Sequence, residues 1–442
     1  MSDRFIYDTT HNFFAFCALY SKQGLMQYIT DRQQVFINRQ FFNLTVFTLI
    51  FGVMFYDMID SLGFSYVDEI CAVLLLALFG YKVFQSKTWQ FNRAFLFTLT
   101  VFIFYLVYSI VIGSNTIGAI LTDFVIQLKP YLAFFCVFAI NPVLSDNQKK
   151  IIRQLIVLCS LYVLTIGVAG LIDYNFIAFT FSHLSRLATA SSILALLYLY
   201  CSNFSITDRF VFIMILAVGV LSTRSKHFGY FAFCTLFIIY FSRPVTMKFN
   251  LKNTVFTVIV LAFTVLVAWE KIYFYFITGG LGSGRSTNEL YARMALYYFS
   301  IIILKDFIPF GSGFASYATY TSGASYSPIY IKYGMHNMYG LTKSAPNFVA
   351  DTYYPALAQF GYVGVVLFFY FWFYLAKKAV SAYAKGYRKE SLISIMIILF
   401  FLIECTSDST ITHNRGMFMM MLSGLILSDI KIKNTNEGTD RQ

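Results

Sequence analysis

An otherwise almost continuously apolar chain is interrupted once by a long polar region, and four short stretches in or next to this region decide how the chain folds. They are GGLGSGR (279–285), LYARMALYYFSIIIL (290–304), PFGSG (309–313) and ADTYYPALAQFGYVG (350–364). Glycine, serine and tyrosine are frequent in the segments between them. Irregular backbone is not tolerated where it would face lipid, because its polar groups find no partners there. The sequence therefore predicts that the loop from 271 to 351 folds outside a surrounding helical bundle.

The overall composition is that of a membrane protein. The chain has 442 residues, of which 58% are hydrophobic and only 12% are charged. A soluble domain of this composition would aggregate, whereas a bundle that faces lipid requires an apolar surface. The net charge of +12 does not by itself indicate nucleic-acid binding, and we expect none. Lysine and arginine gather in the cytoplasmic loops of membrane proteins.

The apolar runs predict an all-α polytopic membrane protein with about 12 transmembrane helices, because a spanning helix needs about 20 apolar residues. The expected spans are 42–60, 66–84, 94–113, 123–141, 152–172, 185–203, 208–223, 227–242, 253–270, 353–376, 391–407 and 414–430. Together they form one transmembrane domain, 42–430. We expect a cytoplasmic segment before it, 1–41, without a cleaved signal peptide. The polar tail 431–442 is expected to be disordered.

The distribution of lysine and arginine predicts the orientation of the chain. With both termini in the cytoplasm, most of these residues lie on the inner side, including the strongly basic loop 377–389. The opposite orientation would place that loop outside, against the positive-inside rule. We therefore expect the 271–351 loop on the outer face. None of the seven cysteines lies in this loop, so no disulfide framework is expected to hold it.

The apolar run 290–304 is an alternative candidate for a further span. Its uninterrupted core lies between Arg293 and Lys305 and reaches only about half of the length that a spanning helix needs. We expect instead a helix that lies at the membrane interface and packs over the bundle. The residues that recur at helical spacing along it are Leu290, Met294, Tyr297, Ile301 and Leu304.

Cationic residues on the predicted outer side are candidates for binding an anionic substrate. The arginines there are Arg186, Arg224, Arg285, Arg293 and Arg415. Guanidinium groups match the geometry of phosphate oxygens, although some of these arginines could simply anchor helix ends at lipid headgroups. Lys129 lies in the half-polar stretch DFVIQLKPYLAFF (123–135), where we expect the wall of a polar cavity.

Histidine and aspartate supply the candidate proton acceptors. His336 could act as a general base or be an ordinary surface residue. Asp351 precedes a helix-start pattern, so it could cap that helix or take part in catalysis. The histidines of the outer side (183, 227, 336 and 413) are scattered over separate segments. No metal site or cofactor is therefore expected, since zinc ligands recur at short spacings.

The order of these motifs resembles the O-antigen polymerase and O-antigen ligase superfamily of bacterial polysaccharide assembly. The matching features are STRSKHFGY (222–230), an arginine before an apolar stretch (Arg293), KDFIPFGSGFASY (305–317) and the segment ADTYYPALAQFGYVG. The resemblance covers about 200–370, and it extends plausibly to LKPYLAFF (128–135). Each motif alone is weak, and their order and spacing carry the likeness.

The resemblance implies a metal-independent glycosyltransferase of the bacterial inner membrane, acting on a glycan linked to undecaprenyl diphosphate at the periplasmic face. A polymerase of lipopolysaccharide biosynthesis would transfer the growing chain onto the next lipid-linked repeat unit. By position, Arg224 and Arg293 would grip the diphosphate. Independently of the resemblance, the cationic side chains Arg285, Lys129 and Arg415 are further substrate-binding candidates. Asp351 or His336 would be catalytic. A chain-length regulator and a flippase would be its protein partners.

Alternatives remain open at this stage. The ligases of this superfamily carry a histidine at the first position of a polar pair before G-x-x-G, where this chain has Ala350. His336 and Asn337 form such a pair earlier, but Asn347 then stands where the first glycine should be. The residues therefore favour a polymerase over a ligase. A lipid-linked oligosaccharide flippase or other transporter is the competing class, although no internal repeat is evident. A non-catalytic assembly partner is a third.

Overall fold

The computed structural model describes residues 32–85, 93–242 and 291–439, together with five single positions between 243 and 290. All regular elements in these residues are helices. Six of the helices are long and apolar enough to cross a membrane: Arg32–Met54, Arg93–Ile112, Ile117–Ile140, Asp146–Ile172, Leu184–Cys201 and Tyr354–Ala384. The expected class, an all-α membrane protein, is confirmed to this extent, and the number of twelve spans stays a prediction.

The remaining helices fall close to other predicted spans. They are α3 (Val67–Gln85), α9 (Ile206–Val218) with the short η2 (Gly219–Ser222), α10 (Ser225–Phe241), α16 (Arg388–Glu404) and α17 (Asn414–Thr439). The long helices within the six candidates are α4 (Arg93–Ile112), α5 (Ile117–Ile140), α6 (Asp146–Ile172), α8 (Leu184–Cys201) and α15 (Gly361–Ala384). The predicted span 253–270, the glycines of 279–285 and the segment 1–31 lie outside the described residues.

Several helix ends differ from the sequence-based bounds, and local chemistry explains them. The first helix is already formed at Arg32, ahead of the expected start at 42, and it ends in a π-helical turn, η1 (Thr48–Met54). Helix α6 starts at Asp146 because Ser145 and Gln148 cap it reciprocally, each side chain accepting the other residue's backbone N–H. A prediction based on apolar residues places the start of a helix too late when the first turn of that helix is polar.

The C-terminal segment also differs from the expectation of disorder from 431 onward. Helix α17 continues through Thr439. Its last turns are held by the Lys433 ammonium, which lies 2.6 Å from the Glu390 carboxylate on α16. The Lys385 ammonium also donates to the Asn434 side chain. Polar composition predicted a free tail here, whereas contacts with neighbouring helices keep the segment helical.

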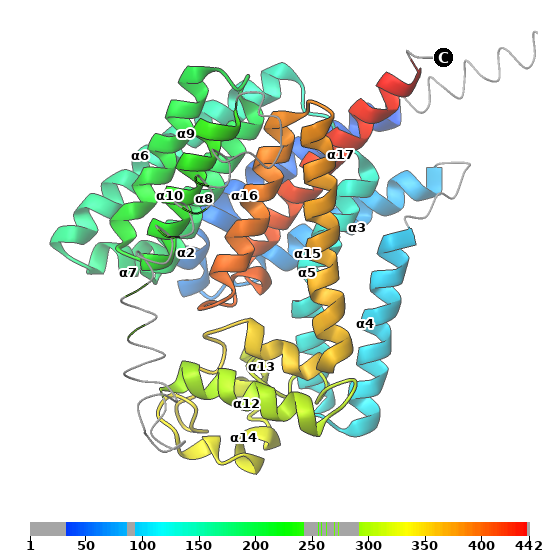
Figure 1. Ribbon diagram of the computed structural model, residues 1–442, viewed down its shortest axis with the longest axis vertical. Coiled ribbons are helices and arrows are strands. Elements are labelled where there is room, and N and C mark those ends of the chain that lie inside the picture. Colours follow the sequence, from blue (N-terminus) through cyan, green and yellow to red (C-terminus); the bar gives the residue numbers. More distant parts are fainter. Residues whose placement is uncertain are drawn as a thin grey trace, which may run out of the picture.

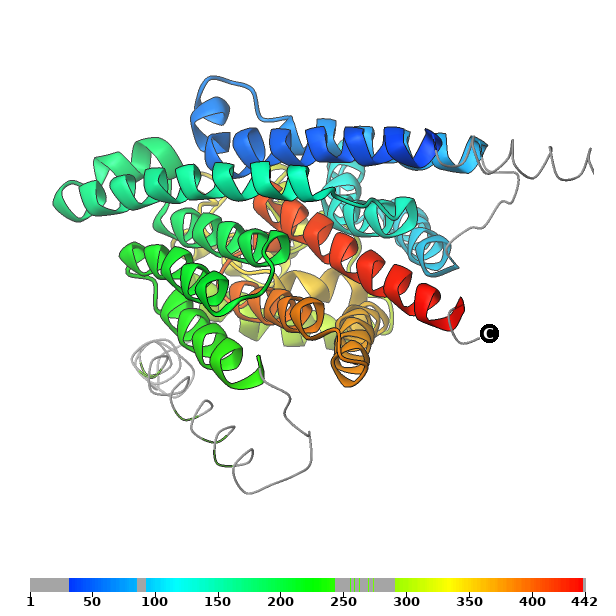
Figure 2. The same cartoon turned by 90° about the horizontal axis from the view of Figure 1, so that it is seen from above.

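Helix α17 runs through the middle of the bundle, as the view from above shows (Figure 2). It packs closely against α5 at Gly424, where an added Cβ would lie 2.5 Å from the Phe134 carbonyl oxygen. Glycine is therefore needed for the two helices to pack at this distance. The large buried core of the bundle includes residues from both helices, such as Phe135 and Met420.

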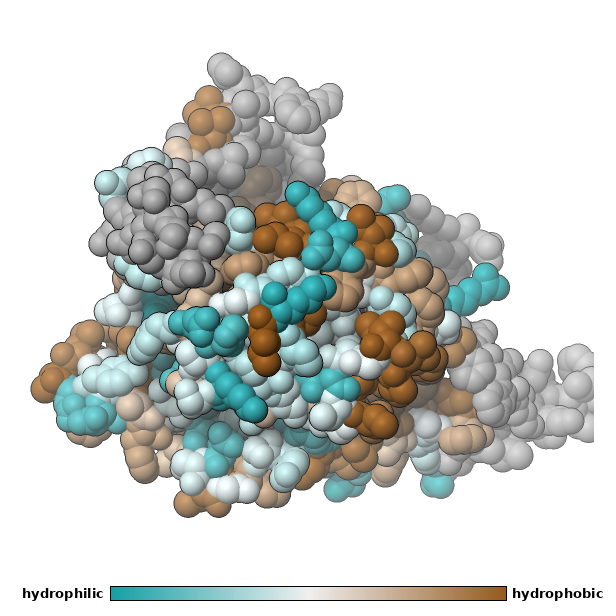
Figure 3. Space-filling model, turned by 90° about the horizontal axis from the view of Figure 1, so that it is seen from below, coloured by the Kyte–Doolittle hydropathy of each residue, from teal (hydrophilic) through white to brown (hydrophobic). Residues whose placement is uncertain are grey.

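The residues from 292 to 360, here called the lid, form a separate unit at one end of the bundle (Figure 1). It contains α12 (Ala292–Asp306), α13 (Tyr320–Ala324), α14 (Pro328–Lys332), η6 (Met335–Asn337) and η7 (Tyr354–Phe360). The lid has a hydrophobic core of its own, which includes Phe299, Tyr317 and Met335. Seen from the lid side, hydrophilic residues cover much of this face, with apolar groups between them (Figure 3).

Helix α12 covers the lid core with a face that differs from the one expected. Its buried residues include Met294, Phe299 and Ile303, whereas Ile301 is 55% exposed. The expected stripe is therefore wrong at Ile301, whereas Met294 is buried and Leu304 packs against the lid core. The apolar run continues on several sides of this helix, so its sequence does not specify which side meets the core.

The two glycine motifs noted in the sequence pack directly against each other. The Gly313 N–H donates to the Gln359 carbonyl at 2.8 Å, and the Val363 N–H donates to the Pro309 carbonyl at 3.3 Å. Gly311 has φ +81°, and a Cβ on it would lie 2.2 Å from the Gly361 nitrogen. This contact joins the lid to the start of α15.

The lid is also fastened to the turn between α4 and α5. The Asn115 amide donates to the Ala315 and Ser325 carbonyls at 2.7 and 2.8 Å. The buried Asp123 carboxylate of α5 accepts the Ala315 N–H at 2.7 Å. The lid is therefore held over one end of the bundle by hydrogen bonds to α5 as well as by its link to α15.

Candidate functional site

Charged side chains from segments far apart in the sequence meet at the end of the bundle that faces the lid. We call this cluster the mouth. It comprises Asp57, His183, Arg186, Arg224, Lys226, Arg293, Asp351, Glu404, Asp408, His413 and Arg415. The turn between α16 and α17 faces the lid in Figure 1, and α2 (Tyr56–Ser61) and α7 (Asn175–Phe181) lie beside it. Electrostatic interactions link Asp351 on the lid side with Lys226 and Asp408 on the bundle side.

Asp57 is the buried centre of one part of the mouth. Its carboxylate pairs with both Arg186 and Arg415, the latter at 2.7 Å. The Arg415 guanidinium also donates to the Val53 carbonyl, which the π-helical turn of the first helix presents. Because its side chain is only 4% exposed, Arg415 supports the site from inside rather than facing a ligand. Arg186 shares the same carboxylate but stays 37% exposed.

Arg224 is the cation of the mouth without a carboxylate partner among the described residues. Its Nη2 lies 2.6 Å from the Nε2 atom of His183. The other ring nitrogen of His183 faces the Ser185 N–H at 3.3 Å, so the imidazole is fixed at the start of α8. Burial and the neighbouring Arg224 lower the pKa of His183. A neutral imidazole beside Arg224 leaves the guanidinium charge uncompensated.

Lys226 joins the α10 start to the segment 405–413, which connects α16 and α17. Its ammonium lies 2.6 Å from Glu404 and 3.5 Å from Asp408. His413 lies 4.0 Å from the other oxygen of Asp408. Burial alone would raise the pKa of Asp408, but Lys226 and the other cationic groups around it hold the value below normal. Asp408 is therefore an ionised carboxylate.

Arg293 and Asp351 bring the two ends of the lid together. Their side chains form an ion pair across the lid. Helix η7 starts at Tyr354 and its N-cap position is Tyr353, without a side-chain cap. Asp351 is thus not a helix cap, and that structural explanation is wrong. Burial raises the pKa of Asp351, although Arg293 acts in the opposite direction.

The other predicted site residues lie elsewhere. Lys129 is buried at the contact of α5 with α3, where it pairs with Asp68 and Glu69, so its charge is compensated inside the bundle. His336 lies in η6 of the lid, and its Nδ1 is buried without a hydrogen-bond partner in the described part of the chain. Within the described part of the chain, no hydrogen bond or ion pair joins His336 to the mouth. Arg285 lies outside the described residues.

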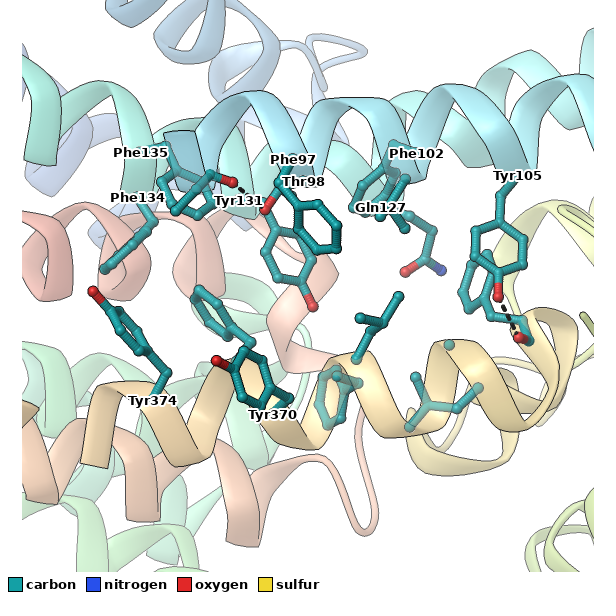
Figure 4. A pocket seen from close by; sticks show the side chains of 18 of the residues that line it. Phe97, Thr98, Phe102, Tyr105, Gln127, Tyr131, Phe134, Phe135, Tyr370 and Tyr374 are labelled. Atoms are coloured by element: carbon teal, nitrogen blue, oxygen red, sulfur yellow. Dashed lines mark hydrogen bonds between the residues drawn. The ribbon is translucent and has the colours of Figure 1, made fainter. Parts of the chain in front are cut away.

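An apolar groove of about 280 Å³ runs between α4, α5 and α15 beside the mouth. Aromatic side chains from the three helices point into it (Figure 4), and its polar groups are the Gln127 amide, the Thr98 hydroxyl and tyrosine hydroxyls. The aromatic residues that line it are Phe97, Phe102, Tyr105, Tyr131, Phe134, Phe135, Phe314, Tyr353, Phe360, Phe368, Tyr370, Phe371 and Tyr374.

The groove adjoins the mouth through Tyr353. Its hydroxyl donates to the Gln127 side chain at 3.2 Å, on the groove side. Its backbone N–H donates to the Cys405 carbonyl at 3.2 Å, at the start of the segment that carries Asp408. A molecule with a long apolar part and an anionic part could therefore contact both regions at once.

The mouth suits an anion better than a metal ion. In the described residues, no group of three or more histidine, cysteine or carboxylate side chains is placed to hold a metal. Two partly exposed guanidinium groups, Arg186 and Arg224, are available beside two histidines whose pKa values are lowered by burial. Guanidinium groups in such a setting form charge-assisted hydrogen bonds with phosphate oxygens.

No model of a known protein family matches the chain, and no curated protein matches it either.

Sequence reasoning missed several residues of the mouth as site candidates, namely Asp57, His183, Lys226, His413, Glu404 and Asp408. The last two belong to the stretch ECTSDSTITH (404–413), a polar break between two apolar runs. That break was a usable signal, because charged residues near a bilayer mark functional or paired positions. Nothing in the linear sequence indicates that it meets Lys226.

Proposed function

We propose that this protein is a polymerase of bacterial surface polysaccharide. It transfers a glycan chain linked to a polyprenyl diphosphate onto the next lipid-linked repeat unit, at the periplasmic face of the inner membrane. The proposal includes about twelve spans and both termini in the cytoplasm. A flippase that supplies lipid-linked units and a regulator of chain length would act beside it.

The observation that carries the proposal is Arg224, a guanidinium group at the mouth that has no carboxylate partner in the part of the chain that the structure describes. An unneutralised cation in a partly buried site is unfavourable unless a ligand supplies the opposite charge. Its neighbour Arg186 is partly exposed and shares its only carboxylate with Arg415. A diphosphate would complete this arrangement, because its oxygens accept from both guanidinium groups.

The aromatic groove supports the same proposal. A polyprenyl chain needs an apolar site between helices that is continuous with the site of its diphosphate. The groove between α4, α5 and α15 is apolar and aromatic, and it meets the mouth at Tyr353. Bulky aromatic side chains bury a large apolar area, which suits a branched hydrocarbon chain.

The chemistry requires the lipid diphosphate to leave from the anomeric carbon while the acceptor hydroxyl attacks. Cationic groups fixed in place stabilise the charge that develops on the leaving group. Arg224 and Arg186 are suited to this role, and Arg293 is near the same site through Asp351. Of the two proton acceptors suggested by the sequence, Asp351 belongs to the mouth and His336 makes no described contact with it.

Deletion and complementation in the host test the proposal. Deleting the gene should shorten the surface polysaccharide to single repeat units, visible as loss of the ladder on a gel. Arg224→Ala should fail to restore the ladder at equal protein level. Losing one charge-assisted contact reduces the rate about tenfold to a hundredfold. Arg209→Ala is the matched control, because Arg209 lies in the first turn of α9 and bonds to Ser205 and Ser242 instead.

If the protein were a ligase or a flippase, its deletion would give a different pattern of polysaccharide on the gel. A ligase deletion would remove the ladder while lipid-linked polymer accumulates. A flippase deletion would leave unpolymerised units on the cytoplasmic side. Wild-type chain lengths with Arg224→Ala would contradict the role given to the mouth.

A further inference from the structure

Asp408 differs from every other carboxylate of the mouth in how its oxygens are used. Asp57 is held by two arginines, and Asp351 by Arg293. Glu404 lies 2.6 Å from the Lys226 ammonium and accepts the Thr410 hydroxyl at 3.4 Å. Asp408 accepts no hydrogen bond from the described residues. The basic side chains closest to it among the described residues are Lys226 at 3.5 Å and His413 at 4.0 Å.

The segment that carries Asp408 is firmly held. The Tyr297 hydroxyl of α12 donates to the Thr406 carbonyl at 2.9 Å. The Ser409 hydroxyl donates to the Ala350 carbonyl at 2.8 Å. These contacts fix Asp408 between two bonds that join the bundle to the lid. Its side chain is 25% exposed, so it is not sealed in the core.

We propose that Asp408 is the general base that takes the proton from the acceptor hydroxyl. This inference rests on the proposed polymerase function and assigns a catalytic residue to it. The acceptor oxygen forms a bond to the anomeric carbon of the donor. The bond from that carbon to the diphosphate oxygen breaks, and its electron pair leaves with the lipid diphosphate. The hydroxyl proton passes to a carboxylate oxygen of Asp408 and then to water.

The surroundings of Asp408 suit this role. The titratable and charged groups around it are Lys226 from α10, His183 and Arg186 from α8 and its cap, His413 from its own segment, Glu404 at the end of α16 and Asp351 of the lid. Lys226 and Arg186 hold the pKa of this carboxylate below normal, so its basic form is present at neutral pH. A carboxylate is a strong enough base here, because a hydroxyl becomes more acidic as it bonds to an electron-poor anomeric carbon.

Asp351 fits the same role less well, although the sequence suggests it. Its carboxylate is bound by the Arg293 guanidinium, which occupies a lone pair that a base would need. Arg293 and Asp351 instead close the two ends of the lid on each other. Asp351 therefore holds the lid and the Arg293 side chain in position.

The test compares Asp408→Asn with two other carboxylate variants in the full-length chain, reconstituted in lipid nanodiscs. The substrate is the pool of lipid-linked repeat units extracted from the deletion strain. Asp408→Asn should lower the polymerisation rate by about a hundredfold or more, as removal of a general base does. Asp408→Glu should recover part of the rate. Asp60→Asn is the matched control, because Asp60 is an exposed carboxylate of α2 outside the mouth.

Two further readouts separate catalysis from structure. Inorganic pyrophosphate should raise the melting temperature of wild type and Asp408→Asn alike, and of Arg224→Ala much less. The wild-type polymerisation rate should fall toward acid pH as the base is protonated. The residual rate of Asp408→Asn should not show this decrease.

A wild-type rate in Asp408→Asn overturns the assignment while leaving the polymerase function intact. Joint loss of rate, pyrophosphate response and thermal stability overturns it in favour of a structural role. A wild-type protein that makes no polymer from these units removes the proposed function, and the base with it.

Discussion

At the scale of single residues, the environment gives the arginines of the mouth different roles. Arg415 is buried against Asp57 and a backbone carbonyl, so removing it would leave a buried carboxylate with one partner fewer. Breaking a buried ion pair costs about 3–5 kcal/mol. Among the described side chains, the Arg224 guanidinium bonds to the His183 imidazole alone. We therefore expect Arg415 variants to lose folded protein, and Arg224 variants to lose function while the fold remains.

The pairing of His183 with Arg224 predicts a pH dependence of stability. Burial first, and then the charge of Arg224, lower the pKa of His183 in the folded state, whereas an unfolded histidine titrates near about 6.5. The unfolded chain therefore binds this proton more readily. The stabilising contribution is present above that pH and is lost as the pH falls through the folded-state pKa.

The variant His183→Gln tests this, because glutamine can still meet Arg224 but does not titrate. The melting temperature of the wild type should fall more steeply between pH 7.5 and 5 than that of His183→Gln. Parallel curves would show that the His183–Arg224 contact does not contribute to acid sensitivity.

At the scale of elements, the link between the lid and α15 depends on two glycine motifs that lie side by side. Gly311 and Gly361 both have positive φ, and their backbones are too close for any side chain between them. The helix that starts at Gly361 leads directly into the wall of the groove, which includes Gly364 and Leu367. The position of the lid over the mouth and the shape of the groove are therefore coupled.

Alanine substitution at two glycines isolates this contact. Gly334 also has positive φ, at +72°, but a Cβ there meets nothing within 4 Å. Gly334→Ala should therefore carry only the backbone strain, about 1–2 kcal/mol. Gly311→Ala should be more destabilising, with a lower melting temperature and faster proteolysis within the lid. Equal effects of the two substitutions would show that the close packing at Gly311 is unimportant.

At the scale of the whole molecule, the groove and the mouth are two halves of one proposed binding site. Residues of α4, α5 and α15 line the groove. The mouth contains residues from α2, α8, α10, α12 and the 405–413 segment. Tyr353 is the residue that contacts both. A substrate with an apolar chain and an anionic head would need both the groove and the mouth. A substitution could therefore block one of the two while the other still binds its part of the substrate.

A substitution that fills the groove tests whether the groove and the mouth bind different parts of the substrate. Thr98→Trp places a large ring in the groove, while Thr100→Trp places the same ring on an exposed position of α4 that does not line it. Thr98→Trp should abolish polymerisation on lipid-linked units and keep the melting-temperature response to inorganic pyrophosphate. Thr100→Trp should behave as wild type in both assays. Normal polymerisation by Thr98→Trp would exclude the groove as the lipid site.

The fold was largely predictable because lipid contact imposes long apolar runs that can be read directly. Helix positions such as α3 and α10 follow from such runs. Errors arose where polar residues form helix ends, as at Asp146, or continue a helix through contacts, as at Lys433. The buried face of α12 was also misjudged at Ile301, because apolar residues on several sides leave the choice to packing.

The sequence by itself determined an all-α membrane protein with a folded segment interrupting its helices, and it singled out Arg224, Arg293 and Asp351. Only the tertiary structure decided which charges face one another: Asp351 with Arg293, Arg415 with Asp57, and Lys226 with Glu404 and Asp408. The reason is physical. Apolarity is a property of consecutive residues, whereas the pairing of charges depends on distances between segments that the chain brings together only on folding.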